Sequence, residues 1–397
     1  MDKKISVKWL VAIVCLFTVA AICITTMFFC FFVVPKREGT LYWHNQKLLE
    51  IKELVDNYYI GEISDQMISD GIASGYVYGL NDAYSGYVTA NDAEANLDAL
   101  LGYNTGIGVQ VSAHPDNNTI YVLDVHKDSP AQKGGIKSSD EIVKLDGQGV
   151  AEMGYSAAVN YIKSRPLGNI LKVTVNRKGE LMDFSVELTT FLSQSVFYKM
   201  IGDKAYIQIT SFNEASVDQF VEAVDAAEKD NAKGIIFDLR GNGGGTLTSV
   251  YHILDYLIPE GLAIEVKYKN EADCQTYLSD ANDVDLPMVV LTDENTASAS
   301  ELFTQGLKDY EKAVSIGRKT FGKGVVQRTF TLSDGSLVKF TVAKYYTANG
   351  TCLDGIGVEP DYPVEWTEDE LRYRLINGIE ADKDFIKACA YLDGQLS

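Results

Sequence analysis

The stretch Trp9–Val34 carries no charged side chain, and it constrains this 397-residue chain more than any other feature. It exceeds the length of about 20 apolar residues that suffices to cross the hydrocarbon core of a bilayer, so it predicts a transmembrane helix. The alternative is a cleaved signal peptide, whose apolar core is only about 7–15 residues long. We therefore expect an uncleaved signal anchor at positions 9–34.

Charges on either side of this stretch bear on its orientation. Lys3, Lys4 and Lys8 precede it, and Lys36 and Arg37 follow it, so the positive-inside rule favours a cytoplasmic N-terminus only weakly. The short tail at 1–8 supports the same orientation, because it leaves the main body of the chain on the other side. We expect a single-pass cell-membrane protein with an extracytoplasmic main body.

Composition excludes several classes of function. The net charge of −20 and the absence of a basic stripe argue against a nucleic-acid partner, since such binding rests on Lys and Arg at phosphates. Three cysteines lie in the apolar stretch, which leaves Cys274, Cys352 and Cys389. Without C-x-x-C or H-E-x-x-H patterns we expect no metal, and no organic cofactor is indicated. A bridge between Cys274 and Cys352 is left open.

Residue patterning divides the rest of the chain into four parts. Apolar residues at helical spacing predict a helical region at 35–102. Short β-like runs with turns between them predict a small domain at 103–190, and alternating strands and helices at 191–365 predict βαβ units on a largely parallel sheet. The segment 366–397 is acidic and helical in pattern, and either caps the core or makes a homo-oligomer. The fold class is thus α+β and α/β in one membrane-anchored, multidomain chain.

The small domain resembles a PDZ domain. The segments that carry this resemblance are Gly106-Ile107-Gly108-Val109, Asp128-Ser129-Pro130-Ala131, Gly135-Ile136 and Asp140-Glu141-Ile142-Val143. Glycine at positions 106 and 108 lets successive backbone N–H groups turn toward one anion, and the adjoining strand edge can accept a peptide. This predicts capture of a free C-terminus at residues 106–109. An ordinary glycine-containing hairpin is the alternative.

Three further segments could carry chemistry. Glycine-rich Gly241–Gly245 follows an apolar strand and precedes a helix, which suits phosphate binding, oxyanion stabilisation or a structural tight turn. Ser298 and Ser300 stand at another strand-to-helix junction, where serine is either a helix cap or an exposed nucleophile. Lys323 lies between two glycines ahead of a strand, although most lysines are simply solvated.

Taken together, these segments resemble the core of the C-terminal processing peptidases, the tail-specific serine proteases of family S41, which use a Ser-Lys active site. The family patterns D-L-R-x-N-x-G-G, S-A-S-A-S-E and F-G-K-G-x-V-Q match Asp238–Gly245, Asn295–Glu301 and Phe321–Gln327 in the same order. Upstream, Asp82 and Tyr84-Ser85-Gly86-Tyr87 also match. Thr296 replaces the first serine of the second pattern, and this departure removes no proposed catalytic side chain.

The resemblance implies a role for each matching residue. Ser298 is the expected nucleophile, Lys323 the general base and Gln327 the residue that orients the base. The N–H groups of Ala299 and Gly244 are expected to hold the oxyanion, with Gly243 as a near alternative. A lysine acts as a base near pH 7 only if its pKa falls well below about 10.4. Because no cation is evident in the motif, we expect burial of Lys323 to lower it.

The leading hypothesis is a membrane-anchored serine endopeptidase with an extracytoplasmic catalytic region. Its partners would be protein or peptide substrates with accessible C-termini, recognised by the PDZ domain and cut through an acyl-enzyme on Ser298. The alternative is a non-catalytic PDZ scaffold or ligand-binding protein on the protease fold. A scaffold has no need of a lysine between glycines at this place, which favours the enzyme.

Overall fold

The computed structural model describes residues 9, 16–22, 24–25, 40–114, 118–280, 284–370 and 378–395. The tail at 1–8 and most of the expected transmembrane span at 9–34 lie outside these residues. Within the described ranges, no helix combines the length and the apolar character needed to cross a membrane. The chain separates into two compact units, Met1–Ser69 and Asp70–Ser397.

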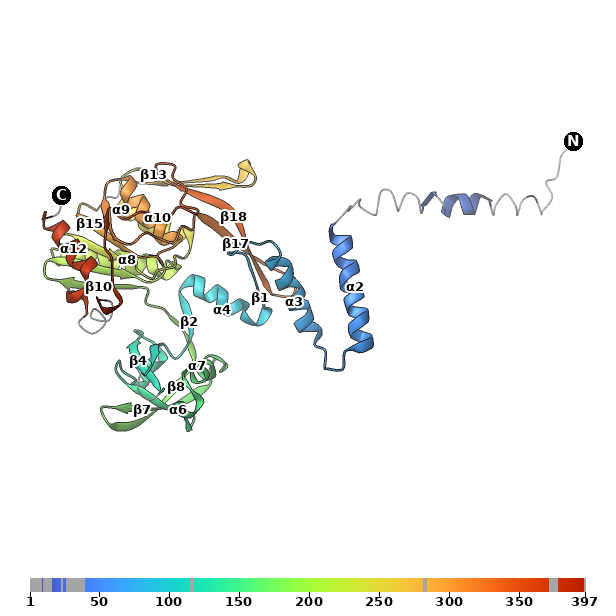
Figure 1. Ribbon diagram of the computed structural model, residues 1–397, viewed down its shortest axis with the longest axis horizontal. Helices are drawn as coiled ribbons and strands as arrows, with labels where there is room; N and C mark the ends of the chain where they lie inside the picture. The colour runs from blue at the N-terminus through green and yellow to red at the C-terminus, as the bar shows by residue number, and fades with distance from the viewer. Residues whose placement is uncertain are drawn as a thin grey trace. The chain divides into compact units, whose positions relative to one another are not determined.

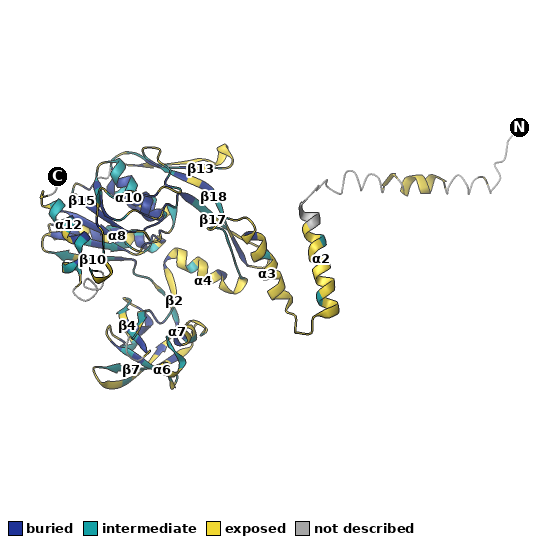
Figure 2. Ribbon diagram, viewed as in Figure 1, coloured by how far each residue is buried: buried dark blue, intermediate teal, exposed yellow. Residues whose placement is uncertain are grey.

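The expected helical region contains helices at the predicted places, but it does not form one unit. α2 spans Thr40–Tyr58, and Figure 2 shows its described side chains almost wholly exposed. α3 spans Asp65–Tyr78, begins after Ser64 and crosses the boundary between the units. α4 spans Ala90–Leu101 within the second unit and ends at Gly102, whose φ of +91° terminates the helix.

The small domain is built on one antiparallel sheet with short helices, as expected for a PDZ domain. Its sheet has the order β3-β4-β5-β7-β8, and β6 pairs with β5. The elements are β3 (Val109–Ala113), β4 (Ile120–Val125), α5 (Pro130–Gly134), β5 (Glu141–Leu145), β6 (Gln148–Gly149), α6 (Val150–Met153), α7 (Tyr155–Lys163), β7 (Ile170–Arg177) and β8 (Glu180–Glu187). Alternate residues of the strands point inward, so Ile120, Val122 and Val173 join one apolar core. Two connecting strands, β2 (Tyr103–Gly106) and β9 (Thr189–Leu192), pair with each other.

A six-stranded sheet forms the centre of the region at 191–365, in the order β10-β11-β12-β15-β16-β19. Its strands are β10 (Val196–Ile201), β11 (Lys204–Ile209), β12 (Ile235–Asp238), β15 (Met288–Thr292), β16 (Ala313–Gly317) and β19 (Tyr362–Pro363). Only the β10–β11 pair is antiparallel, which agrees with the predicted largely parallel sheet. Because β12 and β15 are parallel neighbours, the loops after them emerge at the same edge.

Helices cover both faces of this sheet. α8 (Glu214–Lys229), α9 (Leu247–Leu257) and α10 (Ala299–Asp309) contribute to the core that contains Ile235 and Phe237 of β12. The intervening Ile236 points the other way and packs with Phe385 of α12 (Lys383–Leu392). Figure 1 shows α12 beside β15. In the C-terminal segment, α12 therefore caps the core, and self-association of the segment stays a prediction.

A second sheet was not predicted from the sequence. It has the order β1-β18-β13-β14, with β17 also paired to β18, and all its pairs are antiparallel. The strands are β1 (Gly86–Val88), β13 (Gly261–Tyr268), β14 (Gln275–Ser279), β17 (Val325–Thr331) and β18 (Leu337–Thr347). β1 comes from the region expected to be helical, so a short segment near the N-terminus is built into the same sheet as β18.

The bridge between Cys274 and Cys352 that the sequence left open is not formed in this structure, where both are free thiols.

Candidate active site

Ser298 lies at a sharp turn between β15 and α10. Its backbone has φ +57° and ψ −117°, a combination that only glycine adopts without strain. The turn is held by Thr296, whose hydroxyl donates to the carbonyl oxygen of Leu239 at 2.9 Å. A strained turn of this kind, directly before a helix, presents a serine side chain at the rim of the sheet.

The glycine-rich loop after β12 packs against this turn. Gly244 has φ +101°, and a Cβ added there would lie 2.7 Å from the carbonyl oxygen of Ala297 and 2.9 Å from the nitrogen of Ala299. Buried Asn242 ties the two loops together, because its backbone carbonyl accepts from the N–H of Ala297 and the hydroxyl of Ser300, both at 3.0 Å. The structure thus brings Gly244, Ser298 and Ala299 side by side.

The donors expected at the oxyanion site differ in availability. Ala299 is the first residue of α10, where N–H groups have no acceptor within the helix. The N–H of Gly244, in contrast, donates to the side-chain oxygen of Asn242 at 2.8 Å. For Gly243, no acceptor of its N–H is found among the described residues. Gly243, the near alternative, is therefore the freer of the two glycine donors in this conformation.

The position of Lys323 between two glycines has a steric reason. Gly322 has φ +93°, and a Cβ there would lie 3.2 Å from the nitrogen of Gly357. At Gly324 the added Cβ would lie 2.2 Å from the backbone nitrogen of Asp354. The loop that carries Lys323 is therefore pressed against a neighbouring turn with no room for side chains on either side of the lysine.

The amine of Lys323 is in a half-buried environment. Burial lowers the pKa of Lys323, and nearby Lys339 lowers it further, whereas Asp82 and Glu301 act in the opposite direction. Within the described part of the chain, no carboxylate lies at ion-pair distance from the amine. The direction and the leading cause agree with the sequence-based expectation. The cationic neighbour was missed, because Lys339 lies outside the motif, on β18.

Glu301 joins the serine and lysine loops, and sequence reasoning gave it no role of its own. Its fully buried carboxylate accepts from the N–H groups of Ser298 and Lys323, both at 2.8 Å. It also accepts from the N–H of Gly322 at 2.7 Å and the hydroxyl of Thr320 at 2.5 Å. Four donors compensate for burying this charge. The capping-box spacing from Ser298 to Glu301 was a signal that could have indicated this role.

Tyr345 of β18 makes a second link between the same two loops. Its buried hydroxyl lies 3.0 Å from the carbonyl oxygen of Ser298 and is also hydrogen-bonded to the carbonyl oxygen of Lys323. Gln327, the expected orienting residue, points elsewhere: its amide donates to Val325 on its own strand at 3.4 Å. The structure therefore brings the backbones of Ser298 and Lys323 together, but it does not bring Gln327 to the amine in this conformation.

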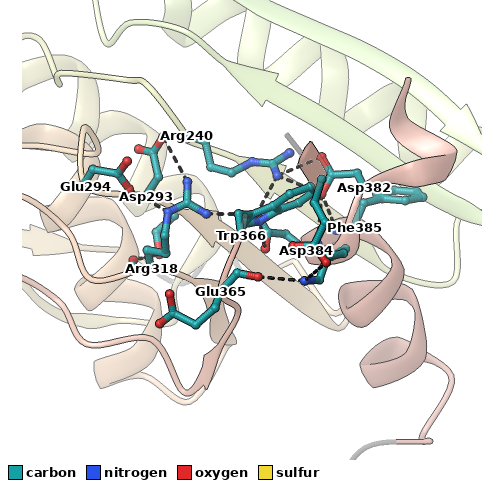
Figure 3. Close-up of polar contacts among 12 residues, drawn as sticks. Arg240, Asp293, Glu294, Arg318, Glu365, Trp366, Asp382, Asp384 and Phe385 are labelled. Atoms are coloured by element: carbon teal, nitrogen blue, oxygen red, sulfur yellow. Dashed lines mark hydrogen bonds and ion pairs between the residues drawn. The ribbon is translucent and has the colours of Figure 1, made fainter. Parts of the chain in front are cut away.

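Arg240, the residue before the glycine-rich loop, belongs to a buried ionic cluster, which Figure 3 shows. Arg240 pairs with Asp238 at 2.5 Å, with Asp382 at 2.9 Å and with Asp384 at 2.7 Å, and the last two precede or begin α12. Trp366 donates its indole N–H to Asp384 at 3.0 Å. Burial raises the pKa of Asp384, although the Arg240 guanidinium opposes this.

Asp293 extends this cluster to the serine loop. Its carboxylate accepts from the N–H of Gly241 at 2.9 Å and from the N–H of Thr296 at 3.0 Å. Arg318 lies 3.8 Å from Asp293 and 3.9 Å from Asp384. One network of charges thus holds the start of α12, the glycine-rich loop and the serine loop together.

In the PDZ domain, the expected peptide-binding residues surround a cavity of about 250 Å³ that is also lined by Val111 and by Val159 and Ile162 of α7. Gly108 has φ +79°, and a Cβ added there would lie 2.2 Å from Cβ of Ser129, whereas the space at Gly106 is open. The side chain of Ile107 is buried in the domain core, so only its backbone can serve the cavity. Val109 begins β3 at the cavity wall.

Comparisons with known proteins agree with this geometry. Residues 203–364 match the model of Peptidase family S41, and residues 105–188 match that of the PDZ domain. The chain is 34% identical over 345 residues to a carboxy-terminal processing protease of Bacillus subtilis (strain 168), covering 85% of this chain and 72% of the relative. It is 32% identical over 345 residues to a probable CtpA-like serine protease of Staphylococcus aureus (strain bovine RF122 / ET3-1), covering 85% and 68%.

A solved structure shows the same fold at lower sequence identity. A putative S41 protease from Bacteroides fragilis NCTC 9343 superposes with a TM-score of 0.58 at 19% identity, covering 82% of this chain and 90% of that one. The superposition shows the fold, and the match to the curated relatives at 34% and 32% identity over most of their length confirms the resemblance drawn from the three motifs. We conclude that the chain belongs to peptidase family S41, is a serine-type peptidase and carries a PDZ domain.

Proposed function

We propose that this peptidase hydrolyses peptide bonds through an acyl-enzyme on Ser298, with Lys323 as general base. One observation carries the proposal: a single buried carboxylate, that of Glu301, binds the backbone N–H groups of both residues at 2.8 Å. Such an arrangement fixes a nucleophile and a base relative to each other, and a scaffold would have no use for it. The strained backbone of Ser298 supports the same assignment.

The reaction begins with the neutral amine of Lys323, which takes the hydroxyl proton of Ser298 as Oγ attacks the scissile carbonyl carbon. The N–H of Ala299 and that of Gly243 or Gly244 stabilise the resulting oxyanion. When the tetrahedral intermediate collapses, the ammonium of Lys323 returns the proton to the departing amine. Water then attacks the acyl-enzyme with the same base, which releases the new C-terminus and restores Ser298.

Recognition of substrate C-termini is proposed for the PDZ cavity. The support is the glycine-containing loop at its rim, the apolar wall from α7 and the name of the Bacillus relative, which describes carboxy-terminal processing. We test this with a short peptide that ends in apolar residues, and with the same peptide amidated at its C-terminus. From the family resemblance we also propose that the PDZ domain inhibits the enzyme until a peptide binds, so the free peptide should raise turnover of a larger substrate and the amidated one should not. Equal stimulation by both would contradict carboxylate recognition.

Membrane anchoring through positions 9–34, with the catalytic region outside the cytoplasm, is proposed from the lack of charge in that stretch. Full-length protein should stay in the membrane fraction after an alkaline carbonate wash. Protease added to intact cells, with the outer barrier opened, should digest the main body. Release by the wash would argue against the anchor, and protection from digestion would argue against the orientation.

The decisive experiment measures hydrolysis of an unfolded protein by the detergent-solubilised full-length chain. Wild type should cut the substrate and Ser298→Ala should not, whereas Ser333→Ala, at an exposed serine in the turn between β17 and β18, should retain turnover as a control. Equal turnover by wild type and Ser298→Ala would sink the nucleophile assignment. No turnover by wild type, with the free activating peptide present, would favour the scaffold alternative.

A further inference from the structure

An aromatic ring from outside the matched protease region lies against the amine of Lys323. The Nζ atom is 4.7 Å from the centroid of the Tyr84 ring, within the range of a cation–π contact. Tyr84 lies well before residues 203–364, the part that matches the peptidase family. The sequence singled out this segment, but none of the roles given above uses it.

The segment that carries Tyr84 is fixed in place by its own hydrogen bonds. Asp82 accepts from the N–H of Tyr84 at 3.1 Å and from the hydroxyl of Ser85 at 2.6 Å. The hydroxyl of Ser85 in turn accepts from the N–H of Thr341 on β18 at 3.2 Å. β1 then pairs with β18, placing Gly86 opposite Lys339. Because the backbone around Tyr84 is fixed in this way, the contact between its ring and the amine of Lys323 is a defined part of the structure.

We propose that Tyr84 is a positioning residue for Lys323: its ring covers the amine, keeps water from it and holds it near Ser298 until substrate arrives. The inference rests on the proposed role of Lys323 as general base. It makes Tyr84, held in place by Asp82 and Ser85, part of the active site, so residues 203–364 are incomplete without it.

The ring acts on the amine in two opposite ways. By excluding water it disfavours the ammonium form, and by presenting its negative face it favours that form. Burial is the leading cause of the lowered pKa of Lys323, so shielding should be the larger effect. The charged groups around the pair are Lys339 on β18, Asp82 before β1, Glu301 on α10 and Asp354, and they stay the same in every variant below.

A series of substitutions at Tyr84 separates the two effects. Tyr84→Phe keeps both the shield and the aromatic face, Tyr84→Leu keeps the shield alone, and Tyr84→Ala removes both. With Ala we expect kcat/KM at pH 7 to fall about tenfold and to recover at higher pH, because the hydrated amine holds its proton longer. Leu should not move the acid limb to higher pH, and Phe should restore the wild-type profile.

The experiment records kcat/KM against pH for the full-length variants, and it also titrates Lys323 without turnover. Competitive acetylation by acetic anhydride at a series of pH values, quantified by mass spectrometry of the peptide containing Lys323, reports the fraction of neutral amine directly. Tyr87→Ala, which removes a tyrosine from the adjoining strand, is the matched control and should leave the titration unchanged. If Tyr84→Ala does not fold, Tyr84→Val serves, since valine is too short to reach the amine.

An upward shift of the Lys323 titration with Ala or Val, absent with Phe and Leu, would support the proposal. An unchanged titration with Ala or Val, or an equal shift with Leu, would overturn it. The acetylation arm separates this inference from the proposed function. If Lys323 titrates as expected but no variant shows turnover that depends on Ser298, the shielding role stands and the peptidase mechanism falls.

Discussion

The carboxylate of Glu301 accepts a hydrogen bond at 2.8 Å from the backbone N–H of Ser298, the residue that begins its own helix. The same oxygen accepts from the N–H of Lys323 at 2.8 Å, although 22 positions of sequence separate that residue from Glu301. One side chain thus defines the distance between the two loops on which the proposed chemistry depends.

Replacing Glu301 by Gln should therefore disrupt the site without changing its volume. The amide has one acceptor oxygen, so in either orientation its NH2 group would face at least one backbone N–H donor, at a cost of about 3 kcal/mol of unfolding free energy. A displacement of about 1 Å between nucleophile and base should lower kcat by about 100-fold. Urea unfolding and steady-state kinetics measure both quantities. Glu228→Gln, at an exposed site on α8, is the control, and a fully active Glu301→Gln would contradict the positioning role.

The backbone strain at Ser298 predicts a stability difference between two inactive variants. Ser298→Gly relieves the strain of the φ of +57°, but glycine also gives the unfolded chain more conformational freedom. The net effect should leave Ser298→Gly about 1 kcal/mol more stable than Ser298→Ala. Urea unfolding at pH 7 checks this. Ser300→Gly is the contrast, because it inserts glycine into α10 and should destabilise. Equal stability of the two Ser298 variants would mean that the turn is unstrained.

Lys339 should influence the pH dependence of the reaction. Its charge lowers the pKa of Lys323, after burial, so Lys339→Gln should raise that pKa and move the acid limb of kcat/KM to higher pH. Because Lys339 is exposed, we expect kcat/KM at pH 7 to fall only about two- to fivefold. The effect should fade in 1 M salt. Lys267→Gln, on the neighbouring strand β13, serves as control, and a shift to lower pH would have the wrong sign.

The buried cluster around Arg240 predicts unequal effects of its members. Arg240→Gln leaves three buried aspartates without their main partner and should cost about 3–5 kcal/mol of unfolding free energy, together with activity. Asp384→Asn should cost under about 1 kcal/mol, because burial already raises the pKa of Asp384 and its ionised form is disfavoured in the fold.

Because the pKa of Asp384 is raised in the folded state, its contribution to the free energy of unfolding should change with pH in a defined direction. Its stabilising contribution is greatest below the unfolded-state pKa and is lost as pH rises through the folded pKa. The advantage of wild type over Asp384→Asn should therefore shrink from pH 4 to pH 7 in urea unfolding. A growing advantage would show that Asp384 is held as a stabilised carboxylate.

The PDZ loop offers a test with two glycines, Gly106 and Gly108, on either side of Ile107. Gly108→Ala puts a Cβ 2.2 Å from that of Ser129 and should abolish stimulation by a free C-terminal peptide. Gly106→Ala strains a backbone with φ +145° but meets no neighbouring atom, so it should weaken the stimulation less. Fluorescence anisotropy with a labelled peptide measures the loss directly. Equal binding by both variants would place the carboxylate elsewhere.

Much of the fold followed from local pattern. The largely parallel sheet and a small domain of short strands were predicted because alternating apolar strands, helical spacing and turn residues are local signals, and the resemblance of four segments added the PDZ assignment. The second sheet was missed because its strands come from distant segments: β1 lies near the N-terminus and pairs with β18 far along the chain. No local pattern records such a pairing. The membrane segment lies mostly outside the described residues and stays a prediction.

The candidate site divides in the same way. The sequence by itself determined which loops carry the serine, the lysine and the oxyanion glycines, because each of these segments has a family pattern of its own. Only the tertiary structure decided what joins them: Glu301 and Tyr345 fix the serine loop to the lysine loop, and Tyr84 reaches the amine of Lys323 from another part of the chain. The reason is physical. Hydrogen bonds and shielding from water depend on distances of a few ångströms, and sequence separation does not encode those distances until the chain has folded.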